Sequence, residues 1–445
     1  MSGRRLLVLF LVLGAIGLPA GVLRAACAGR SCHSDSHGTV RIPFCPLPDN
    51  LKTEIAAGYR EGRSPDVLAV TTSATLWGGT EDRSGLAAAW PSVSGGPSTL
   101  VPIVFWGTGV SKAARLPSVV GLDQIAPTLS TIIGFRRPHP DVRAGRPLRG
   151  VGDGARPRLV VEIAWTGIGS GQLRHTPGAW PYLRTMMRTG VGTLDGDTGS
   201  LPLDPAATLT TIGTGGLPFQ HGITGTLLRN DKGRLVRAWG PHSPLSVIAT
   251  LADDLDQAMK QRPKIGLVAP NTADRGIIGG NWYLKHDRDA VVIARGRGAV
   301  HAARRMLATG FGHDEIPDIL AVVLEGTIRS MDARTRAIVS AAVRASGGSL
   351  VVAVAGTGEA RPAARSQEAA ISRLVSDVDS AAAHGARLVS GVVPGGLFLD
   401  QRELAKLGVS GDAAVQALMQ VTDGRGRRIM DDSFQGFAVS FARYC

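Results

Sequence analysis

The sequence predicts an α/β fold with a mostly parallel sheet and helices on both of its faces. Short apolar runs recur along the chain, and such runs are typical of strands that are buried on both faces. Helical stretches separate most of these runs, as in repeated strand-helix-strand units. The chain has 445 residues, 44% of them hydrophobic, which is enough to bury a large core.

The first strand is expected at residues 65–72 and the second at 101–107, where Val101, Ile103, Val104 and Phe105 form an apolar run. A helix is expected over residues 122–134. Residues 135–157 are rich in Arg, Pro and Gly and are predicted to be a linker. The remaining strands are predicted at residues 158–164, 265–269, 290–294, 319–324 and 350–355, and further helices at 299–308, 333–345 and 413–421.

The N-terminus has the pattern of an export signal. Arg4 and Arg5 precede an apolar run over residues 6–18, which is a charged region followed by an apolar region of suitable length. Residues 1–28 are therefore predicted to be a signal peptide or a membrane anchor, and the sequence leaves both open. The protein is expected outside the cytoplasm, either secreted or anchored to the cell membrane.

Cysteine placement agrees with export. Three cysteines, Cys27, Cys32 and Cys45, lie early in the chain, and Cys445 is the last residue. No zinc-binding spacing is present among them. We expect a disulfide between Cys32 and Cys45, with Cys27 and Cys445 either joined or free.

The chain is strongly basic, with 49 Lys and Arg against 36 Asp and Glu, a formal charge of +13. One interpretation is a coding preference for Arg. The other is attraction to an anionic envelope surface or to phospholipid. No basic run is interleaved with aromatic residues, so nucleic acid is not expected as a partner.

Residues 203–223 carry the most informative motif. Thr214-Gly215 ends a predicted helix and is followed by Pro218-x-x-His221-Gly222-Ile223. The segment resembles the nucleophile segment of the alkaline phosphatase superfamily, most closely its type I phosphodiesterase and nucleotide pyrophosphatase branch. In that family a Ser or Thr nucleophile lies about ten residues before the Gly, and here that position is Pro205, which has no hydroxyl.

The resemblance also implies two divalent metals, usually zinc, held by Asp and His. The position of the first Asp is Thr166 here, and the segment matching Asp-x-x-x-His is Glu325 to Arg329. Neither an Asp-His pair nor an Asp-x-x-x-His spacing occurs anywhere in the chain. No metal cofactor is therefore predicted. A slipped alignment leaves Thr208 and Thr211 as candidate nucleophiles, with zinc as the cofactor.

The order of the segments differs from that of the family. Residues 65–150 resemble the family's C-terminal part and residues 158–360 its N-terminal part, so the chain resembles a circular rearrangement. Residues 29–445 are predicted to form a single alkaline phosphatase-like α/β domain. We expect its strands in residues 65–150 to pair with those in residues 158–355 in one mostly parallel sheet.

A second candidate site follows the strand at 265–269. Asn271, Asp274, Arg275 and His286 could form a binding site for an anionic ligand, with a plain surface loop as the alternative. Taken together, the sequence predicts an exported protein without hydrolase activity that acts as a binding or envelope component. The alternative is a metal-dependent phosphodiesterase or phosphatase with an atypical site.

Overall fold

A computed structural model describes residues 43–73, 86–88, 90–94, 99–280, 282–283, 288–362 and 365–444. Residues from Pro43 onward form one unit by themselves. The strands are β1 (Val67–Thr71), β2 (Leu86–Ala88), β3 (Leu100–Gly107), β4 (Val120–Gly121), β5 (Leu159–Trp165), β6 (Val191–Asp197), β7 (Leu227–Arg229), β8 (Leu235–Arg237), β9 (Ile265–Ala269), β10 (Ala290–Ile293), β11 (Asp318–Leu324), β12 (Leu350–Gly356), β13 (Ala360–Pro362), β14 (Val389–Val393), β15 (Gly396–Leu399) and β16 (Met430–Gln435).

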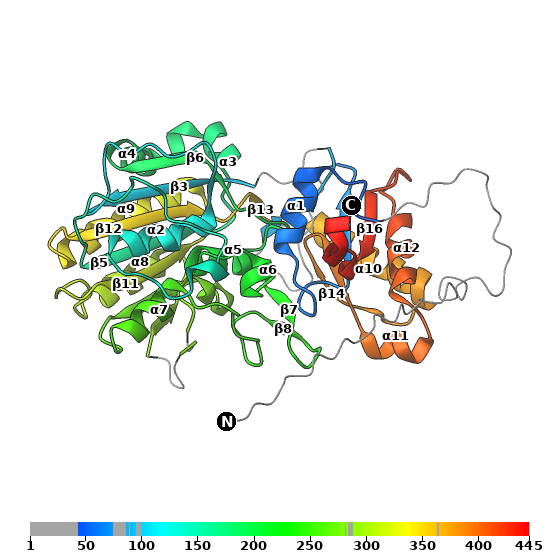
Figure 1. The fold of residues 1–445 in the computed structure, drawn as a ribbon. Coiled ribbons are helices and arrows are strands. Elements are labelled where there is room, and N and C mark those ends of the chain that lie inside the picture. Colours follow the sequence, from blue (N-terminus) through cyan, green and yellow to red (C-terminus); the bar gives the residue numbers. More distant parts are fainter. Residues whose placement is uncertain are drawn as a thin grey trace, which may run out of the picture. The chain divides into compact units, whose positions relative to one another are not determined.

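The α-helices are shown with the strands in Figure 1. They are α1 (Asp49–Gly58), α2 (Ile125–Ile132), α3 (Ser170–His175), α4 (Pro181–Thr189), α5 (Pro205–Thr214), α6 (Pro218–His221), α7 (Leu251–Ala258), α8 (Arg297–Leu307), α9 (Ile328–Ala345), α10 (Arg365–Ala383), α11 (Gln401–Leu407) and α12 (Gly411–Gln420). The 3₁₀ helices are η1 (Leu122–Gln124), η2 (Pro140–Val142), η3 (Pro177–Ala179), η4 (Thr272–Ile277) and η5 (Gly436–Tyr444).

The larger sheet has eight strands in the order β10-β9-β11-β5-β12-β3-β6-β4. The five strands β10, β9, β11, β5 and β12 run parallel to one another, and β3 is antiparallel to both β12 and β6. This confirms the predicted α/β class and the mostly parallel sheet.

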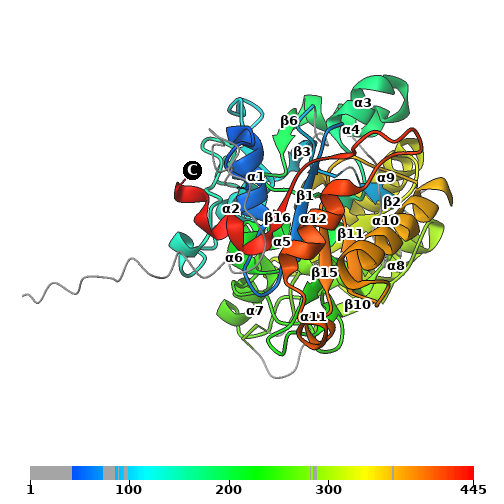
Figure 2. The same cartoon turned by 90° about the vertical axis from the view of Figure 1, so that its right-hand side faces the viewer.

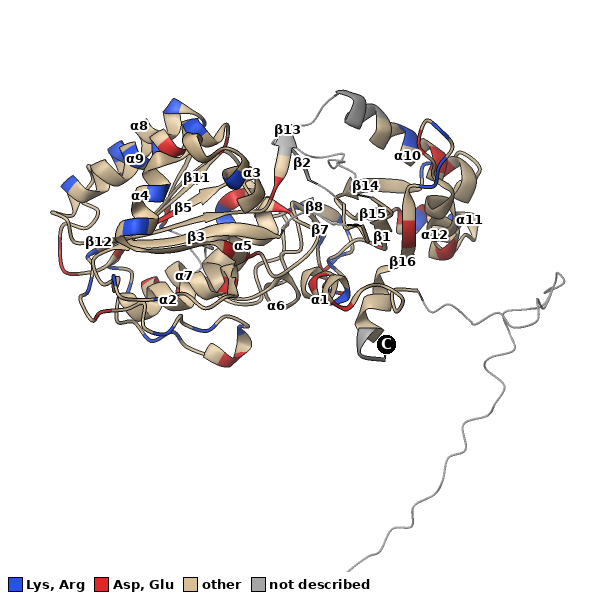
Figure 3. Cartoon of the chain, turned by 90° about the horizontal axis from the view of Figure 1, so that it is seen from above, with Lys and Arg blue, Asp and Glu red and all other residues tan. Residues whose placement is uncertain are grey.

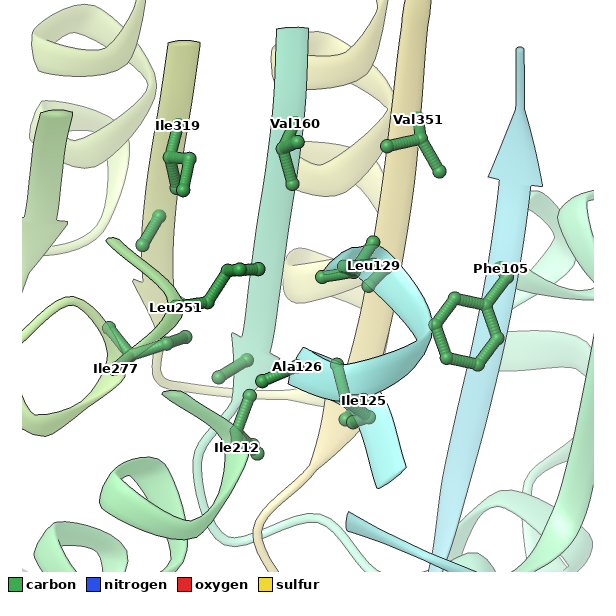
Figure 4. Packing of buried hydrophobic residues seen from close by; sticks show 14 of the residues in the cluster. Phe105, Ile125, Ala126, Leu129, Val160, Ile212, Leu251, Ile277, Ile319 and Val351 are labelled. Carbon is green, nitrogen blue, oxygen red and sulfur yellow. The ribbon is translucent and has the colours of Figure 1, made fainter. Parts of the chain in front are cut away.

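Helices cover both faces of the larger sheet, because the residues of the central strands β9, β11, β5 and β12 are buried on both sides. On one face, Val160 of β5 packs with α2, α5 and α7, as Figure 4 shows for Leu129, Ile212 and Leu251. On the other face, Val161 of β5 packs with α4, α8 and α9. Burial of both faces explains why these strands are continuous apolar runs in the sequence.

Strand β1 does not belong to this sheet. It pairs antiparallel with β15 and β16 in a four-stranded sheet of order β14-β15-β1-β16. The expectation that residues 65–72 pair within the large parallel sheet is therefore wrong, whereas β3 does pair with β12 and β6. An apolar run identifies a buried strand but not the sheet that receives it.

The smaller sheet is also covered on both faces. Val67 and Ala69 of β1 pack with α10 and α12, and Leu68 and Val70 pack with α1 and the start of η5. Figure 2 shows β1 and β16 with α12 beside them.

Residues 135–157 are not a loose linker. Arg137 and Arg143 are buried, and both donate to the carbonyl oxygen of Thr214 at the end of α5 and form ion pairs with Asp254 of α7. These charged contacts fasten the segment to the helices on the larger sheet. A buried cation is stable only when its charge and its N–H groups are paired, and both are paired here.

Several predictions about the chain ends fall outside the described residues. These include the apolar run at 6–18 and the cysteines Cys27, Cys32 and Cys445, so the disulfide pairing stays a prediction. Within the described residues, no helix has the length and apolar character needed to cross a bilayer.

Candidate functional site at the edge of the parallel sheet

Helix α5 begins at the edge of the larger sheet where the parallel strands end. Asp204 is its N-cap, and the carboxylate accepts a hydrogen bond from the Ala206 N–H at 2.9 Å. Pro205 takes the first helical position, where its missing N–H costs nothing. Gly215 ends the helix with φ of 76°.

The backbone of α5 lies directly against η4. A Cβ on Gly213 would be 2.4 Å from the carbonyl oxygen of Ile277, and one on Gly276 would be 2.0 Å from Thr210 Oγ1. Glycine at both positions allows this close approach. The contact fixes the C-terminal half of α5 relative to the segment that follows β9.

Polar side chains from several strand ends gather around the start of α5. Asp204 caps α5, Asp274 lies in η4 after β9, and Glu325 follows β11 directly. Thr166 follows β5 and donates its backbone N–H to the carbonyl oxygen of Leu324, which places it beside Glu325. We call Thr166, Asp204, Asp274 and Glu325 the edge cluster.

The electrostatics of the edge cluster are dominated by its carboxyl groups. Burial raises the pKa of Asp274 to about 7, and the negative charges of Glu325 and Asp204 add to the increase. Arg295 opposes it, with its Nε 3.5 Å from Glu325 Oε1. Three carboxyl groups beside one guanidinium favour binding of a cation or of a hydrogen-bond donor over binding of a phosphate anion.

The carboxylate oxygens already accept hydrogen bonds from protein donors. Asp204 Oδ1 accepts from Ala206 and from the Thr226 hydroxyl, and Asp274 Oδ2 accepts from the Asn271 N–H at 3.0 Å. Among the described residues, no group of three or more His, Cys, Asp or Glu side chains is arranged to hold a metal ion. The residues around the start of α5 therefore do not fit the dinuclear zinc site of the resembled family.

The two candidate nucleophiles are both committed to structural hydrogen bonds. The Thr208 hydroxyl donates to the carbonyl oxygen of Asp204 at 2.9 Å, within its own helix. Thr211 Oγ1 lies 3.1 Å from His221 Nε2, and His221 Nδ1 accepts the N–H of Ile223. His221 thus braces the turn after α5.

The electrostatic surroundings keep His221 neutral. It is fully buried, and this burial, with the charges of Arg63 and Arg60, lowers its pKa to about 3. Because Nδ1 accepts a hydrogen bond, the ring proton lies on Nε2 and is donated to Thr211. A neutral imidazole in this position orients a turn and leaves neither threonine activated.

The second predicted site is only partly assembled. The Asn271 N–H donates to the Asp274 carboxylate, and Asn271 Oδ1 accepts a hydrogen bond from the Arg295 guanidinium at 3.0 Å. Arg275 instead donates to the carbonyl oxygen of Gly279 at 2.7 Å and lies 3.4 Å from Asp289. His286 lies outside the described residues.

Sequence reasoning missed Asp204, a member of the edge cluster, and Arg295, which contacts Glu325 and Asn271. Asp204 was detectable, because an Asp directly before Pro is a strong helix-start signal. Arg295 was not, since only the parallel pairing of β10 with β9 brings it beside Asn271.

Comparison with known proteins gives a limited result. No protein-family model matches the chain. No curated protein matches it either.

Among solved structures, the chain is similar to wild-type alkaline phosphatase PafA, with 16% identity and a TM-score of 0.43 over 60% of this chain and 76% of that one. A PafA mutant gives 13% identity and a TM-score of 0.41 over the same shares of the two chains. Phosphonoacetate hydrolase from Sinorhizobium meliloti 1021 gives 15% identity and a TM-score of 0.30 over 45% of this chain and 57% of that one. At this level the similarity assigns no activity to the chain.

Proposed function

We propose that this protein is an extracytoplasmic component of the cell envelope, secreted or membrane-anchored. In this proposal the start of α5 does not hydrolyse phosphate esters and the protein acts by binding. The proposed partner is an anionic envelope surface or phospholipid, in keeping with the charge of +13.

The observation that carries this proposal is the chemistry at the start of α5. The position of the family's nucleophile is a proline ring, and the first hydroxyl along α5, that of Thr208, donates to the backbone carbonyl oxygen of Asp204. A threonine hydroxyl becomes a nucleophile when a base accepts its proton, whereas the hydrogen-bond partner of the Thr208 hydroxyl is a backbone carbonyl oxygen, which is not a base. The negative charge of the edge cluster further opposes the approach of a phosphate group.

The alternative is a metal-dependent phosphoesterase with an atypical site. Its support is the collection of Asp204, Asp274 and Glu325 close to one helix start. Carboxylate oxygens are ligands for hard divalent cations, so added metal could displace the present hydrogen bonds.

Elemental analysis and a phosphoesterase screen of the full-length protein, with and without added Zn²⁺, distinguish the two. We expect no stoichiometric metal and no turnover of phosphomonoesters or phosphodiesters above background. The variants Asp204→Asn and Thr208→Val are compared with Asp412→Asn, which lies away from this edge on α12. Two bound metals per chain, with turnover lost in the first two variants alone, would contradict the proposal.

A further inference from the structure

We infer that one face of the protein, formed around α1, docks on a bilayer that contains anionic phospholipid. The inference rests on the proposed envelope function and specifies which surface meets the lipid. We call this surface the α1 face and define it by the exposed apolar residues Phe219, Leu245, Val247, Phe437 and Phe441.

Hydrogen bonds from two arginines just after α1 connect the parts of this face. Arg60 donates to the carbonyl oxygen of Phe219 at 2.8 Å, and Arg63 donates to that of Leu245 at 3.1 Å. The N–H of Val247 donates to the carbonyl oxygen of His221, which ends α6. Phe219, Leu245 and Val247 are therefore held around the same two cations.

The C-terminal helix η5 completes the face. It contacts α1, and Ser440 lies within hydrogen-bond distance of Glu61. The Phe437 and Phe441 rings are 6.4 Å apart, and the residues are 49% and 55% exposed. Figures 2 and 3 show α1, α6 and the C-terminal end on one side of the chain.

The residues have the chemistry of a membrane-water interface. Aromatic and aliphatic side chains are exposed there, with polar neighbours such as Gln220 and Ser440 between them. Such side chains enter the headgroup region of a bilayer, while cations beside them meet anionic headgroups. Most exposed apolar residues of a soluble protein are scattered, so a set gathered around one helix indicates an interaction surface.

The point at which the N-terminal segment joins the described structure favours lipid over another protein. The Phe44 ring lies 5.3 Å from that of Phe434, two residues before η5 begins. The preceding 42 residues contain the apolar run at 6–18. If that run enters a bilayer, the segment joins the protein beside the α1 face.

The helices α8 and α9 are the main competing surface. Figure 3 shows several basic residues on them, and Arg304 and Arg305 of α8 are exposed. The buried residues of α8 face the sheet, and its exposed side offers charge without a comparable set of aromatic residues. Surface charge without apolar side chains supports weaker binding that salt readily screens.

The test places a photoreactive benzoylphenylalanine at position 219 or 437 of the full-length protein. Control positions are 293 on β10, where Ile293 is 49% exposed, and 301 on α8. The proteins are mixed with phosphatidylcholine vesicles with or without phosphatidylglycerol and then illuminated. We expect labelling of lipid at 219 and 437 to exceed that at 293 and 301 several-fold, and to increase with phosphatidylglycerol.

A second measurement uses vesicle flotation. The double variant Phe437→Ser/Phe441→Ser should bind phosphatidylglycerol vesicles about tenfold more weakly than the parent protein. The matched control, Ile293→Ser/Leu407→Ser, should bind as the parent does. If the N-terminal segment holds the protein on the vesicles in every variant, the labelling pattern alone decides.

Three outcomes would overturn the inference. Lipid labelling at 293 or 301 equal to that at 219 and 437 would leave the phospholipid partner standing but place it on another face. Crosslinks between protein chains at 437 would assign the face to a second copy. Absence of flotation with either vesicle would remove the phospholipid partner itself, while metal content and hydrolysis would still test the rest of the proposed function.

Discussion

At the scale of single residues, Glu162 is the most unusual side chain of the described core. It lies on β5 at the centre of the larger sheet and is 2% exposed, and its Oε2 has no hydrogen-bond partner among the residues that the structure describes. It follows Val160 on the face covered by α2 and α5. Burial raises the pKa of Glu162 from 4.5 to about 8, and the positive charge of Arg137 opposes this increase.

This burial predicts a pH-dependent stability. The Glu162 carboxyl group releases its proton near pH 4.5 in the unfolded chain and only near pH 8 in the folded chain. The contribution of protonated Glu162 to the free energy of unfolding is therefore complete below about pH 4.5. It is lost as the pH rises to about 8. Between these limits the free energy of unfolding should fall by a few kcal/mol more in the parent than in Glu162→Gln. Urea denaturation at a series of pH values measures the difference.

The matched control for this prediction is Glu315→Gln, since the side chain of Glu315 is 93% exposed. Its profile should follow that of the parent. Parallel profiles for the parent and Glu162→Gln would show that Glu162 ionises in the folded protein as it does in the unfolded chain.

Some residues of the candidate site could be identified from the sequence, and others could not. Pro205 and Thr166 could be identified as departures from the family pattern because each occupies a defined position in a motif. The proximity of Asp204, Asp274 and Glu325 could not, because it depends on which strands are neighbours. Pairing of β11 with both β9 and β5 brings these strand ends together.

At the scale of elements, the packing of α5 against η4 leads to a second prediction. Alanine normally favours a helix over glycine by up to about 1 kcal/mol. At Gly213 the added methyl group would meet the backbone of Ile277 and Gly276, which cannot move as a flexible side chain would. Gly213→Ala should therefore lower the free energy of unfolding by about 1–3 kcal/mol, as measured in urea.

Gly298→Ala in α8 is the control. A Cβ there would meet only the Cβ of Ala294, at 3.9 Å, so this variant should be as stable as the parent or more stable by up to about 1 kcal/mol. If Gly213→Ala behaved in the same way, α5 and η4 would have to be farther apart than the structure places them.

Elements differed in how well the sequence predicted them. The strand predicted at 265–269 has those bounds as β9, because its apolar run ends sharply at Pro270. The hairpin of β14 and β15 was missed, although its strands flank the turn residues Pro394 and Gly395. The linker prediction for 135–157 was wrong, because the composition of a segment does not show which of its residues are buried. Arg137 and Arg143 form ion pairs with Asp254 of α7, more than 100 residues away.

At the scale of the whole molecule, the class of the fold could be predicted and its division into sheets could not. Alternation of buried strands with helices is a local pattern, so it is visible in one sequence. Assignment of β1 to the smaller sheet depends on β15 and β16, which lie more than 300 residues later. Only the tertiary structure reports such pairings.

The order of the segments leads to the last prediction. A circular permutant that joins residue 444 to residue 43 and opens the chain after Gly154 would place the segments in the order of the resembled family. The described ends are close to each other, since the Phe44 ring lies 5.3 Å from that of Phe434 and η5 contacts α1. Gly154 is exposed, and a Cβ there would meet no atom within 4 Å.

Chains tolerate new ends at exposed positions of this kind when few contacts are lost. With a flexible Gly-Ser linker of about ten residues across the old ends, the permutant should give the circular dichroism spectrum and the cooperative urea transition of residues 43–444 in the natural order. A control permutant opened after Leu209 should not fold, because the cut would divide the buried helix α5 in its middle, next to the contact of Thr210 with Gly276. If the permutant opened at Gly154 failed and the control folded, the segment at 135–157 would carry structure that its contacts with Thr214 and Asp254 do not explain.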